Sequence, residues 1–546
     1  MKKTVLIGVM IVICVSFVFG AGGEEAAAES GIAVTPAGTY PIVEEPVTLK
    51  VLTTRNNWGP VKSFDDIWVL NWYEEFTGVD VDWQVVLQDG AQKVNLMLAS
   101  QTDLPDLFIH NFSQDQLLLY GDQGLFIPLN DMIDELGHGI KMTFQFDPDV
   151  RKKITAPDGN IYSFFNTTES SHGDYGQKMW INKQWLDNLG LEMPTTTEEY
   201  YQVLKAFKEN DANGNGDPND EIPLSGAGFW HFANIDGFLM NPFTSSPSLK
   251  RAVLEDGKVT VPFTKPEYRE GLRYLKRLWD EDLMDKEIFV LTHAQLKPIA
   301  EHPNGPRIGS LGHMHLGWLD FSMDTKEQYT WVLPLKGPTG LQQTEYYIPG
   351  ISMCMTITNV SEIPEVAYRW GDGFYLRASN GGIYKDVGYW EFEGKADIGY
   401  RLAEPGEVGI DGKPAVWERF PYSFTKENGG VRNAWNWYST AYYKTSLVDI
   451  PGQWAHEKTL LQATWAYEKY RVDNLVPPLF MSAEDAVERA ELEVTIYDYV
   501  YENVAKFISG DRDLDADWDM FQSQLKKMGL PRYLELMQKG YENQWK

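Results

Sequence analysis

Hydrophobic and polar positions alternate first with the period of strands and then with that of helices. Residues 47–54 alternate and are β-branched, which predicts a strand, and residues 79–87 have the same pattern. Residues 64–76 instead repeat apolar side chains about every 3.6 positions, which predicts a helix that ends at the following glycine. A helix over 91–100 and a strand over 106–110 come next. This βαβαβ order predicts a mostly parallel sheet with helices on its faces.

The rest of the chain carries the same two periods. Strands are predicted over 161–165, 178–181, 307–311, 329–333 and 346–358, and helices over 195–209, 266–281, 364–376 and much of 482–546. A chain of 546 residues is longer than one ordinary domain, so we expect at least two α/β lobes with cores of their own.

The N-terminus has the pattern of a secretory signal peptide. A basic Met1-Lys2-Lys3 precedes an apolar run over 4–19, and Gly20 closes a tolerated cleavage sequence. We therefore predict a signal peptide over 1–20, with an uncleaved anchor as the alternative. Residues 21–46 are rich in Ala, Gly, Glu and Pro, which predicts a flexible leader. The mature protein is expected in the periplasm or outside the cell.

The positions of the two cysteines and the net charge bear on membrane anchoring, disulfides and binding partners. Cys14 lies inside the signal after bulky Ile13, which is not a convincing lipobox, and Cys354 alone cannot form an internal disulfide. Lys plus Arg is 48 and Asp plus Glu is 78, so the net charge is −30. Nucleic acid needs a basic footprint, so this balance argues against nucleic-acid binding and against docking on an anionic membrane.

An oxygen-rich loop is the strongest local motif. Asp211, Asn213 and Asn215 place side-chain oxygens at every second position, Gly216 follows for the turn, and more acids come after it. Hard cations are bound by about six to eight such oxygens. The order matches D-x-[DN]-x-[DN]-G of the helix–loop–helix calcium motif, although Ile222 stands where its closing acid belongs. We predict a structural calcium ion, with a solvated acidic turn as the alternative.

Several short patterns occur in a specific order along the chain. They are Leu98–Asp106 (LASQTDLPD), Asp158–Tyr162 (DGNIY), Trp180–Leu186 (WINKQWL), the loop from Asp211 to Pro223, and Trp331–Pro338 (WVLPLKGP). Together they resemble the extracellular solute-binding proteins of bacterial ABC carbohydrate importers, especially the long lipoprotein-like and alginate-binding members. The resemblance runs from about residue 47 to the C-terminus.

This resemblance implies a two-lobed periplasmic-binding-protein fold with crossing strands and extra C-terminal helices. Residues 47–165 plus about 306–375 are assigned to the N-terminal lobe, and 166–305 plus about 376–546 to the C-terminal lobe. The family's calcium ligands carry over to Asp211, Asn213, Asn215, Asp217 (by its backbone oxygen), Asp220 and Glu221. One residue is inserted before the last two acids, and the lipobox cysteine of many relatives is missing.

The resemblance also implies an oligosaccharide held between the lobes, which close over it by a hinge motion. A sugar has apolar C–H faces and a rim of hydroxyls, so its cleft needs aromatic rings beside planar polar groups. Small ligands bind beyond the carboxyl ends of parallel strands. Our candidate ligand-binding residues combine these features: Arg55, Asn57, Trp58, Asn111, Trp230, Trp318, Tyr347, Trp390, Trp435 and Trp437.

Three other functions are possible for an acidic, aromatic-rich exported protein: a polysaccharide-degrading enzyme, a metal-binding protein and a sugar sensor. A secreted glycoside hydrolase or lyase needs two carboxylates at a defined separation. Glu391 with Glu393 could share a strand face, and residues 280–282 are a cluster of acids, but neither set comes with an acid/base signature. His313 and His315 could bind a zinc ion from one strand, but the sequence shows no pattern that supplies the further ligands zinc needs. A sugar sensor for a histidine kinase remains a second use of the same fold. We predict a monomeric binding protein, not an enzyme, that passes an oligosaccharide to an importer's membrane permease.

Overall fold

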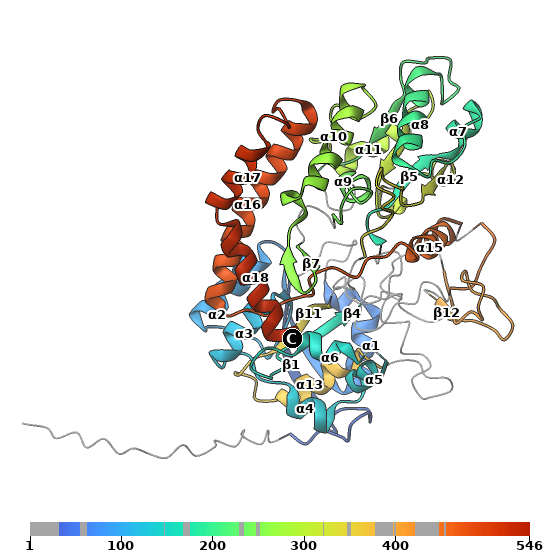
Figure 1. Ribbon diagram of the computed structural model, residues 1–546. Coiled ribbons are helices and arrows are strands. Elements are labelled where there is room, and N and C mark those ends of the chain that lie inside the picture. Colours follow the sequence, from blue (N-terminus) through green and yellow to red (C-terminus); the bar gives the residue numbers. More distant parts are fainter. Residues whose placement is uncertain are drawn as a thin grey trace, which may run out of the picture.

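The computed structural model describes most of the chain. The described residues are 32–54, 63–146, 148–167, 175–228, 234–246, 252–319, 321–346, 351–376, 397, 400–420, 447–452 and 455–546. Two sheets, each flanked by helices, form two lobes, which lie below and above one another in Figure 1. The predicted α/β class is therefore confirmed.

The first sheet has the strand order β2-β1-β3-β11-β4. These strands are β1 (Val47–Thr54), β2 (Val79–Val86), β3 (Leu107–Phe112), β4 (Phe164–Thr167) and β11 (Ile351–Ile357). β1 pairs in parallel with β2 and β3, while β11 runs antiparallel to β3 and β4. The carboxyl ends of β1, β3 and β4 and the start of β11 therefore lie at one edge of this sheet.

The second sheet has the order β10-β5-β9-β6. Its strands are β5 (Met179–Asn182), β6 (Ile222–Ser225), β9 (Ile308–Gly312) and β10 (Tyr329–Val332). β6 and β9 are parallel, and β5 is antiparallel to both β9 and β10. Met179 faces Gly312 and Val332, so the ends of β9 and β10 lie beside the start of β5.

β9 and β10 correct the expected division of the chain. Residues 306–375 were expected in the N-terminal lobe, but both strands hydrogen-bond within the second sheet. Among the described strands of this stretch, only β11 (Ile351–Ile357) returns to the first sheet. Sequence pattern locates a strand but not its partner, because pairing is decided by contacts between distant segments. The rest of the assignment of residues to lobes stays a proposal.

Helices cover both sheets. Around the first sheet lie η1 (Phe64–Asp66), α1 (Trp68–Thr77), α2 (Gly90–Ser100), α3 (Gln114–Asp122), α4 (Asn130–Leu136), α5 (Gly139–Phe146), α6 (Asp149–Ile154) and α13 (Pro364–Gly373). Around the second lie α7 (Lys183–Leu189), α8 (Thr197–Glu209), α9 (Asp236–Leu239), η3 (Pro262–Thr264), α10 (Pro266–Asp280), α11 (His293–Ala300), η4 (Leu316–Leu319), α12 (Met323–Glu327) and α15 (Ala455–Glu468). Two short hairpins, β7 (Val253–Glu255) with β8 (Lys258–Thr260) and β12 (Tyr400–Leu402) with β13 (Trp417–Arg419), complete the described strands.

Three C-terminal helices run along both lobes. They are α16 (Ala483–Ser509), α17 (Trp518–Lys527) and α18 (Leu530–Trp545), drawn in red at the side of Figure 1. α16 packs against α10 of the second lobe and α3 of the first. At the second contact Asp115 accepts the backbone N–H of Met481, and Arg489 lies near the same carboxylate. Helices were expected here, as the apolar period of this region indicates.

Part of the expected flexible leader is instead packed on the first lobe. Ile42 and Val43 are buried in its core, and the ring of Tyr40 stacks on Phe76 at a centroid distance of 4.4 Å. The guanidinium of Arg369 donates to the carbonyl oxygens of residues 35 and 39. Composition alone suggests flexibility for residues 32–46, but a few apolar anchors suffice to order them. The predicted signal peptide lies outside the described residues.

Candidate functional site: a cleft edge, a cation loop and an outer pocket

The two sheets present their strand ends to the chain segments that cross between the lobes. β4 ends at Thr167 and β5 begins at Met179, so the chain passes from one sheet edge to the other between them. The return crossing lies between β10 and β11. Ligands of open α/β sheets bind outside such edges. The candidate cleft is therefore the space between these two edges.

On the first edge the structure places one of the predicted sugar ligands. Asn111 is exposed near the end of β3, next to His110, whose Nδ1 lies 2.7 Å from the hydroxyl of Thr54 at the end of β1. Burial lowers the pKa of His110, because it disfavours the charged form of the ring. Trp318 lies in η4, with its side chain outside the description. Outside the described residues lie Arg55, Asn57, Trp58, Trp230, Tyr347, Trp390, Trp435 and Trp437.

On the second edge lies a set of buried polar side chains, of which sequence reasoning singled out only His313 and His315. They are no more than 8% exposed and comprise Gln177, Lys178, Asn234, Asp236, His313, His315 and Glu345. The ammonium of Lys178 donates to the carbonyl of Tyr175 at 2.5 Å, and Lys178 itself accepts the backbone N–H of His313 at 2.9 Å. The bond between His313 and Lys178 joins the end of β9 to the start of β5 at the cleft edge.

The two histidines after β9 both contact groups of the protein itself. His313 Nδ1 accepts the backbone N–H of His315 at 2.9 Å, which is a structural role. The rings of His315 and His456 meet edge to face at 4.8 Å, and Glu457 lies 3.6 Å from His315. Within the described residues, no group of three or more His, Cys, Asp and Glu side chains is arranged to hold a metal ion.

The oxygen-rich loop after α8 is folded as a compact turn. Asp211 accepts the backbone N–H groups of Asn215 and Gly216 at 3.0 and 2.9 Å. Asn213 accepts the N–H of Asn215 at 2.9 Å, and Asn215 accepts that of Asp217 at 2.8 Å. Gly214 and Gly216 have positive φ angles of 73° and 92°, which glycine adopts without strain. The predicted side-chain oxygens of Asp211, Asn213 and Asn215 thus all accept backbone N–H groups within the turn.

The acids that follow the turn close it from the other side. Asp220 accepts the side-chain amides of Asn213 and Asn215 at 3.0 and 2.9 Å and is paired with Arg307 at 3.1 Å. Glu221 is only 4% exposed, and burial raises its pKa. Its Oε2 has no hydrogen-bond partner within the described part of the chain. Asp220 therefore links to both amide side chains of the turn, although one residue is inserted in the motif.

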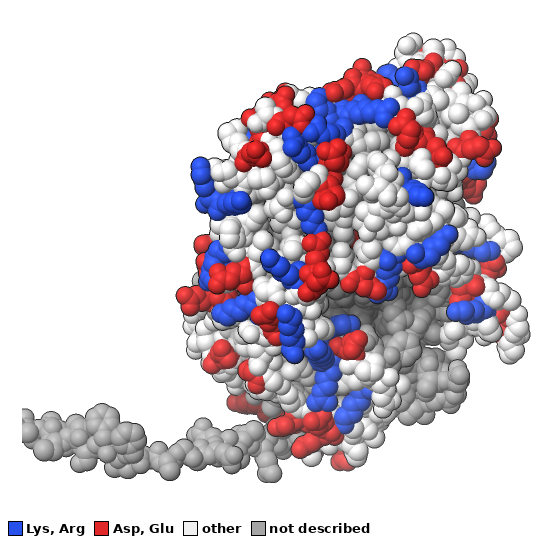
Figure 2. Space-filling view, viewed as in Figure 1, with Lys and Arg blue, Asp and Glu red and all other residues white. Residues whose placement is uncertain are grey.

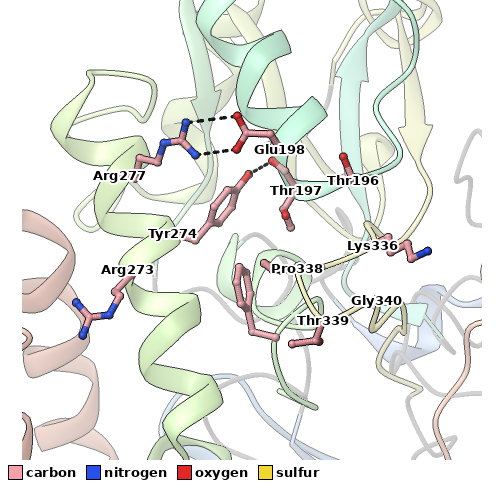
Figure 3. A pocket seen from close by; sticks show the side chains of 12 residues that line it. Thr196, Thr197, Glu198, Arg273, Tyr274, Arg277, Lys336, Pro338, Thr339 and Gly340 are labelled. Carbon is pink, nitrogen blue, oxygen red and sulfur yellow. Dashed lines mark hydrogen bonds and ion pairs between the residues drawn. The ribbon is translucent and has the colours of Figure 1, made fainter.

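A pocket of about 820 Å³ opens on the second lobe (Figure 3). Its walls are the first turn of α8, the middle of α10, the loop Lys336–Gly340 and the ring of Phe243. Thr196 caps α8 by accepting the N–H of Glu199, whose side chain reaches back in a capping box. Glu198, one residue before that, receives two N–H groups from Arg277 at 2.8 and 3.4 Å.

Charged side chains of both signs cover the visible surface. Figure 2 shows Lys and Arg side chains interspersed with Asp and Glu over the visible face, with neither sign forming one continuous field. Many of these charges are paired along helices, as Lys276 is with Asp280 at 2.7 Å. Among the described residues, no helix combines the length and apolar character needed to cross a bilayer.

Comparisons with known proteins identify the family. The model of the bacterial extracellular solute-binding protein family matches residues 58–282. The fructooligosaccharide ABC transporter substrate-binding protein FusA of Streptococcus pneumoniae serotype 4 is 31% identical over 531 residues, covering 92% of this chain and 91% of FusA.

Solved structures agree with this match. FusA in complex with kestose superposes with a TM-score of 0.71 at 28% identity, and a FusA EF-hand mutant in complex with fructo-nystose superposes at 0.70 and 28%; both cover 91% of this chain and 99% of FusA. An HMO-binding solute-binding protein from Bifidobacterium longum infantis shares the fold, with a TM-score of 0.75 at 21% identity over 92% of this chain and 99% of its own. The chain belongs to the bacterial extracellular solute-binding protein family.

Proposed function

We propose that this protein binds an oligosaccharide between its lobes and delivers it to the membrane permease of an ABC importer. The observation that carries the proposal is the match to FusA over nearly the whole of both chains. The fold supports it, because the carboxyl ends of strands from two sheets border the segments that cross between lobes. A monomer that is exported after removal of residues 1–20, and that closes by a hinge, completes this proposal.

The sugar is held without being cleaved in this account. Aromatic rings would bind its C–H faces and amide or guanidinium groups its hydroxyls, with Asn111 contributing from the end of β3. The buried polar set at the second edge would keep the cleft wall in place while the lobes move. A hydrolase or lyase would need two carboxylates at a defined separation, and Glu391 and Glu393 lie outside the described residues.

The first test is a thermal-shift screen against oligosaccharides, with product analysis of every hit. A ligand that binds only the folded protein raises its stability by about 2.7 kcal/mol at a hundredfold excess over Kd. We expect kestose or a longer fructo-oligosaccharide to raise Tm in proportion to the logarithm of its concentration and to be recovered intact. Recovery of cleaved sugar would replace the binding protein by an enzyme.

We also propose that the loop after α8 holds a structural calcium ion. The donor set fits a hard cation: Asp211, Asn213, Asn215, Asp220 and Glu221 offer side-chain oxygens, and Asp217 its backbone oxygen. The unsatisfied, buried Oε2 of Glu221 supports this, because such an atom is costly without a partner. The EF-hand named in the FusA mutant is consistent with it. When bound, calcium would neutralise the acids and fix the turn between α8 and β6.

Calcium removal should lower stability through this loop. EDTA is expected to reduce the free energy of unfolding by about 2–3 kcal/mol, the value for a ligand present at about a hundredfold over Kd. Asp211→Ala should abolish the response to EDTA. Asp217→Ala is the matched control, because the Asp217 carboxylate bonds Asn219 and only its backbone oxygen is assigned to the ion. An EDTA response that persists in Asp211→Ala would contradict the site.

A further inference from the structure

The pocket of Figure 3 lies at the edge of the second lobe that faces the first. Val332 ends β10 beside Met179, where β5 starts. Lys336 follows four residues later and bonds the backbone on both sides of the α8 cap: its N–H donates to Thr195 and its carbonyl accepts from Thr197. The first turn of α8 and the pocket therefore lie next to the strand ends that border the cleft.

The floor of the pocket is a pair of aromatic rings. Phe243 and Tyr274 have centroids 5.6 Å apart and planes inclined by 39°. The hydroxyl of Tyr274 donates to the carbonyl of Thr197 at 2.9 Å, which fixes its ring. Phe243 is partly exposed, and the backbone of Pro242 packs against Gly337, so this floor is continuous with the loop Lys336–Gly340. Such a surface offers an apolar face to a flat ligand.

The wall above the floor is a planar ion pair. The guanidinium of Arg277 makes a cation–π contact with Tyr201, 3.4 Å from the centroid of its ring, while it donates to Glu198. Both side chains remain 40% or more exposed. A guanidinium has five donors and a carboxylate about four acceptor sites, so the pair keeps groups for hydroxyls. This is a fixed donor and acceptor pair beside an aromatic face.

The charge of the pocket suits a neutral ligand. Figure 3 shows Arg273 directed away from the pocket, and it bonds Asp515 at 2.8 Å. Arg277 is balanced by Glu198. Lys336 is exposed at the rim, opposite the pair. Aromatic rings with a neutral polar pair and few net charges are the surroundings of a sugar ring rather than of a phosphate or a basic peptide.

We propose that this pocket is an outer sugar subsite, which binds the end of an oligosaccharide that projects beyond the inter-lobe cleft. The inference rests on the proposed function and deepens it, because it makes affinity depend on chain length. A short ligand would occupy the cleft alone. A longer one would also stack on Phe243 and bond Glu198 and Arg277.

The test fills the pocket and compares ligands of different length. Thr339 is exposed in the pocket loop, so Thr339→Trp blocks the space without removing a buried group. Titration calorimetry is run with kestose, fructo-nystose and longer members of the same series. We expect Thr339→Trp to weaken binding of the longest ligands about tenfold, a loss of about 1.4 kcal/mol, and to change kestose binding less than twofold.

Two further variants make the result specific. Glu198→Gln keeps the shape of the wall but removes the charge pair, and it should weaken the long ligands in the same way. Thr495→Trp adds the same bulk at an exposed position of α16 and should behave like the unaltered protein. Equal affinity of Thr339→Trp and the unaltered protein for every length would overturn the subsite alone. Failure of the unaltered protein to bind any member would overturn the proposed function for this series and the subsite with it.

Discussion

Replacing Asp372 by alanine is expected to lower the free energy of unfolding by about 3–5 kcal/mol. This residue of α13 is fully buried, and its carboxylate accepts three backbone N–H groups at the start of α5, from His138, Gly139 and Ile140, at 2.9–3.0 Å. A buried donor left without a partner costs about 1–3 kcal/mol. Alanine would leave all three unsatisfied at once.

Urea unfolding monitored by tryptophan fluorescence checks this value. Asp122→Ala is the matched control, because Asp122 is exposed on α3, and its replacement should change stability by less than about 0.5 kcal/mol. Asp372→Asn keeps the volume and one acceptor oxygen, so its loss should be intermediate. A loss below about 1 kcal/mol in Asp372→Ala would show that the N-terminus of α5 is held by other contacts.

Replacing Asp236 by asparagine is expected to stabilise the protein at neutral pH, by up to about 3 kcal/mol. Asp236 begins α9 among buried groups, and burial raises its pKa from 3.8 to about 6. A shift of about two pKa units corresponds to about 3 kcal/mol between the protonation states. Asparagine is neutral at every pH and can still accept the backbone N–H of Gly237, as the carboxylate does.

The pH dependence gives the sign of this effect. Below the unfolded pKa the carboxyl is protonated in both states, and its contribution to stability is fully present. As pH rises through about 6 the folded protein must release that proton in a buried place, and the contribution is lost. The gain of Asp236→Asn over the unaltered protein should therefore be small near pH 4 and grow up to pH 7. A gain that is the same at both pH values would contradict this cause.

The titratable groups coupled to Asp236 come from two other helices. Tyr268 of α10 and Tyr501 of α16 both have raised pKa values, chiefly through burial and then through the charge of Asp236. Because phenols do not titrate below pH 8, they leave the carboxyl as the group that changes in this range. Melting curves of both proteins across this pH range make the comparison.

The first sheet was predicted well because its signals are local. β1 and β2 follow alternating β-branched runs, and α2 follows an apolar period of helical length. α8 lies within the helix predicted over 195–209, and Thr196 and Glu199 form its capping box. In each case the residues that decide the element lie within it or next to it in the sequence, so the sequence pattern predicts the element.

The buried polar residues at the edge of the second sheet could not be predicted from local sequence signals. Gln177 and Lys178 are polar residues whose sequence neighbours do not distinguish them from surface residues, yet both are at most 2% exposed. Their burial follows from the pairing of β5 with β9, which joins segments more than a hundred residues apart. The outer pocket likewise combines α8, α10 and a distant loop. Asn111, by contrast, follows a predicted strand directly, so its place at the edge of the first sheet could be predicted, and its role as a sugar ligand stays a prediction.

The measurement that tests the central claim most directly is calorimetric titration of the mature protein with fructo-nystose, followed by chromatography of the recovered sugar. We predict saturable binding of one sugar per protein molecule, tighter than for sucrose, with all of the sugar recovered intact. Absence of heat and of any thermal shift across neutral and acidic oligosaccharides, or recovery of shortened sugar, would contradict an oligosaccharide-binding protein of an importer.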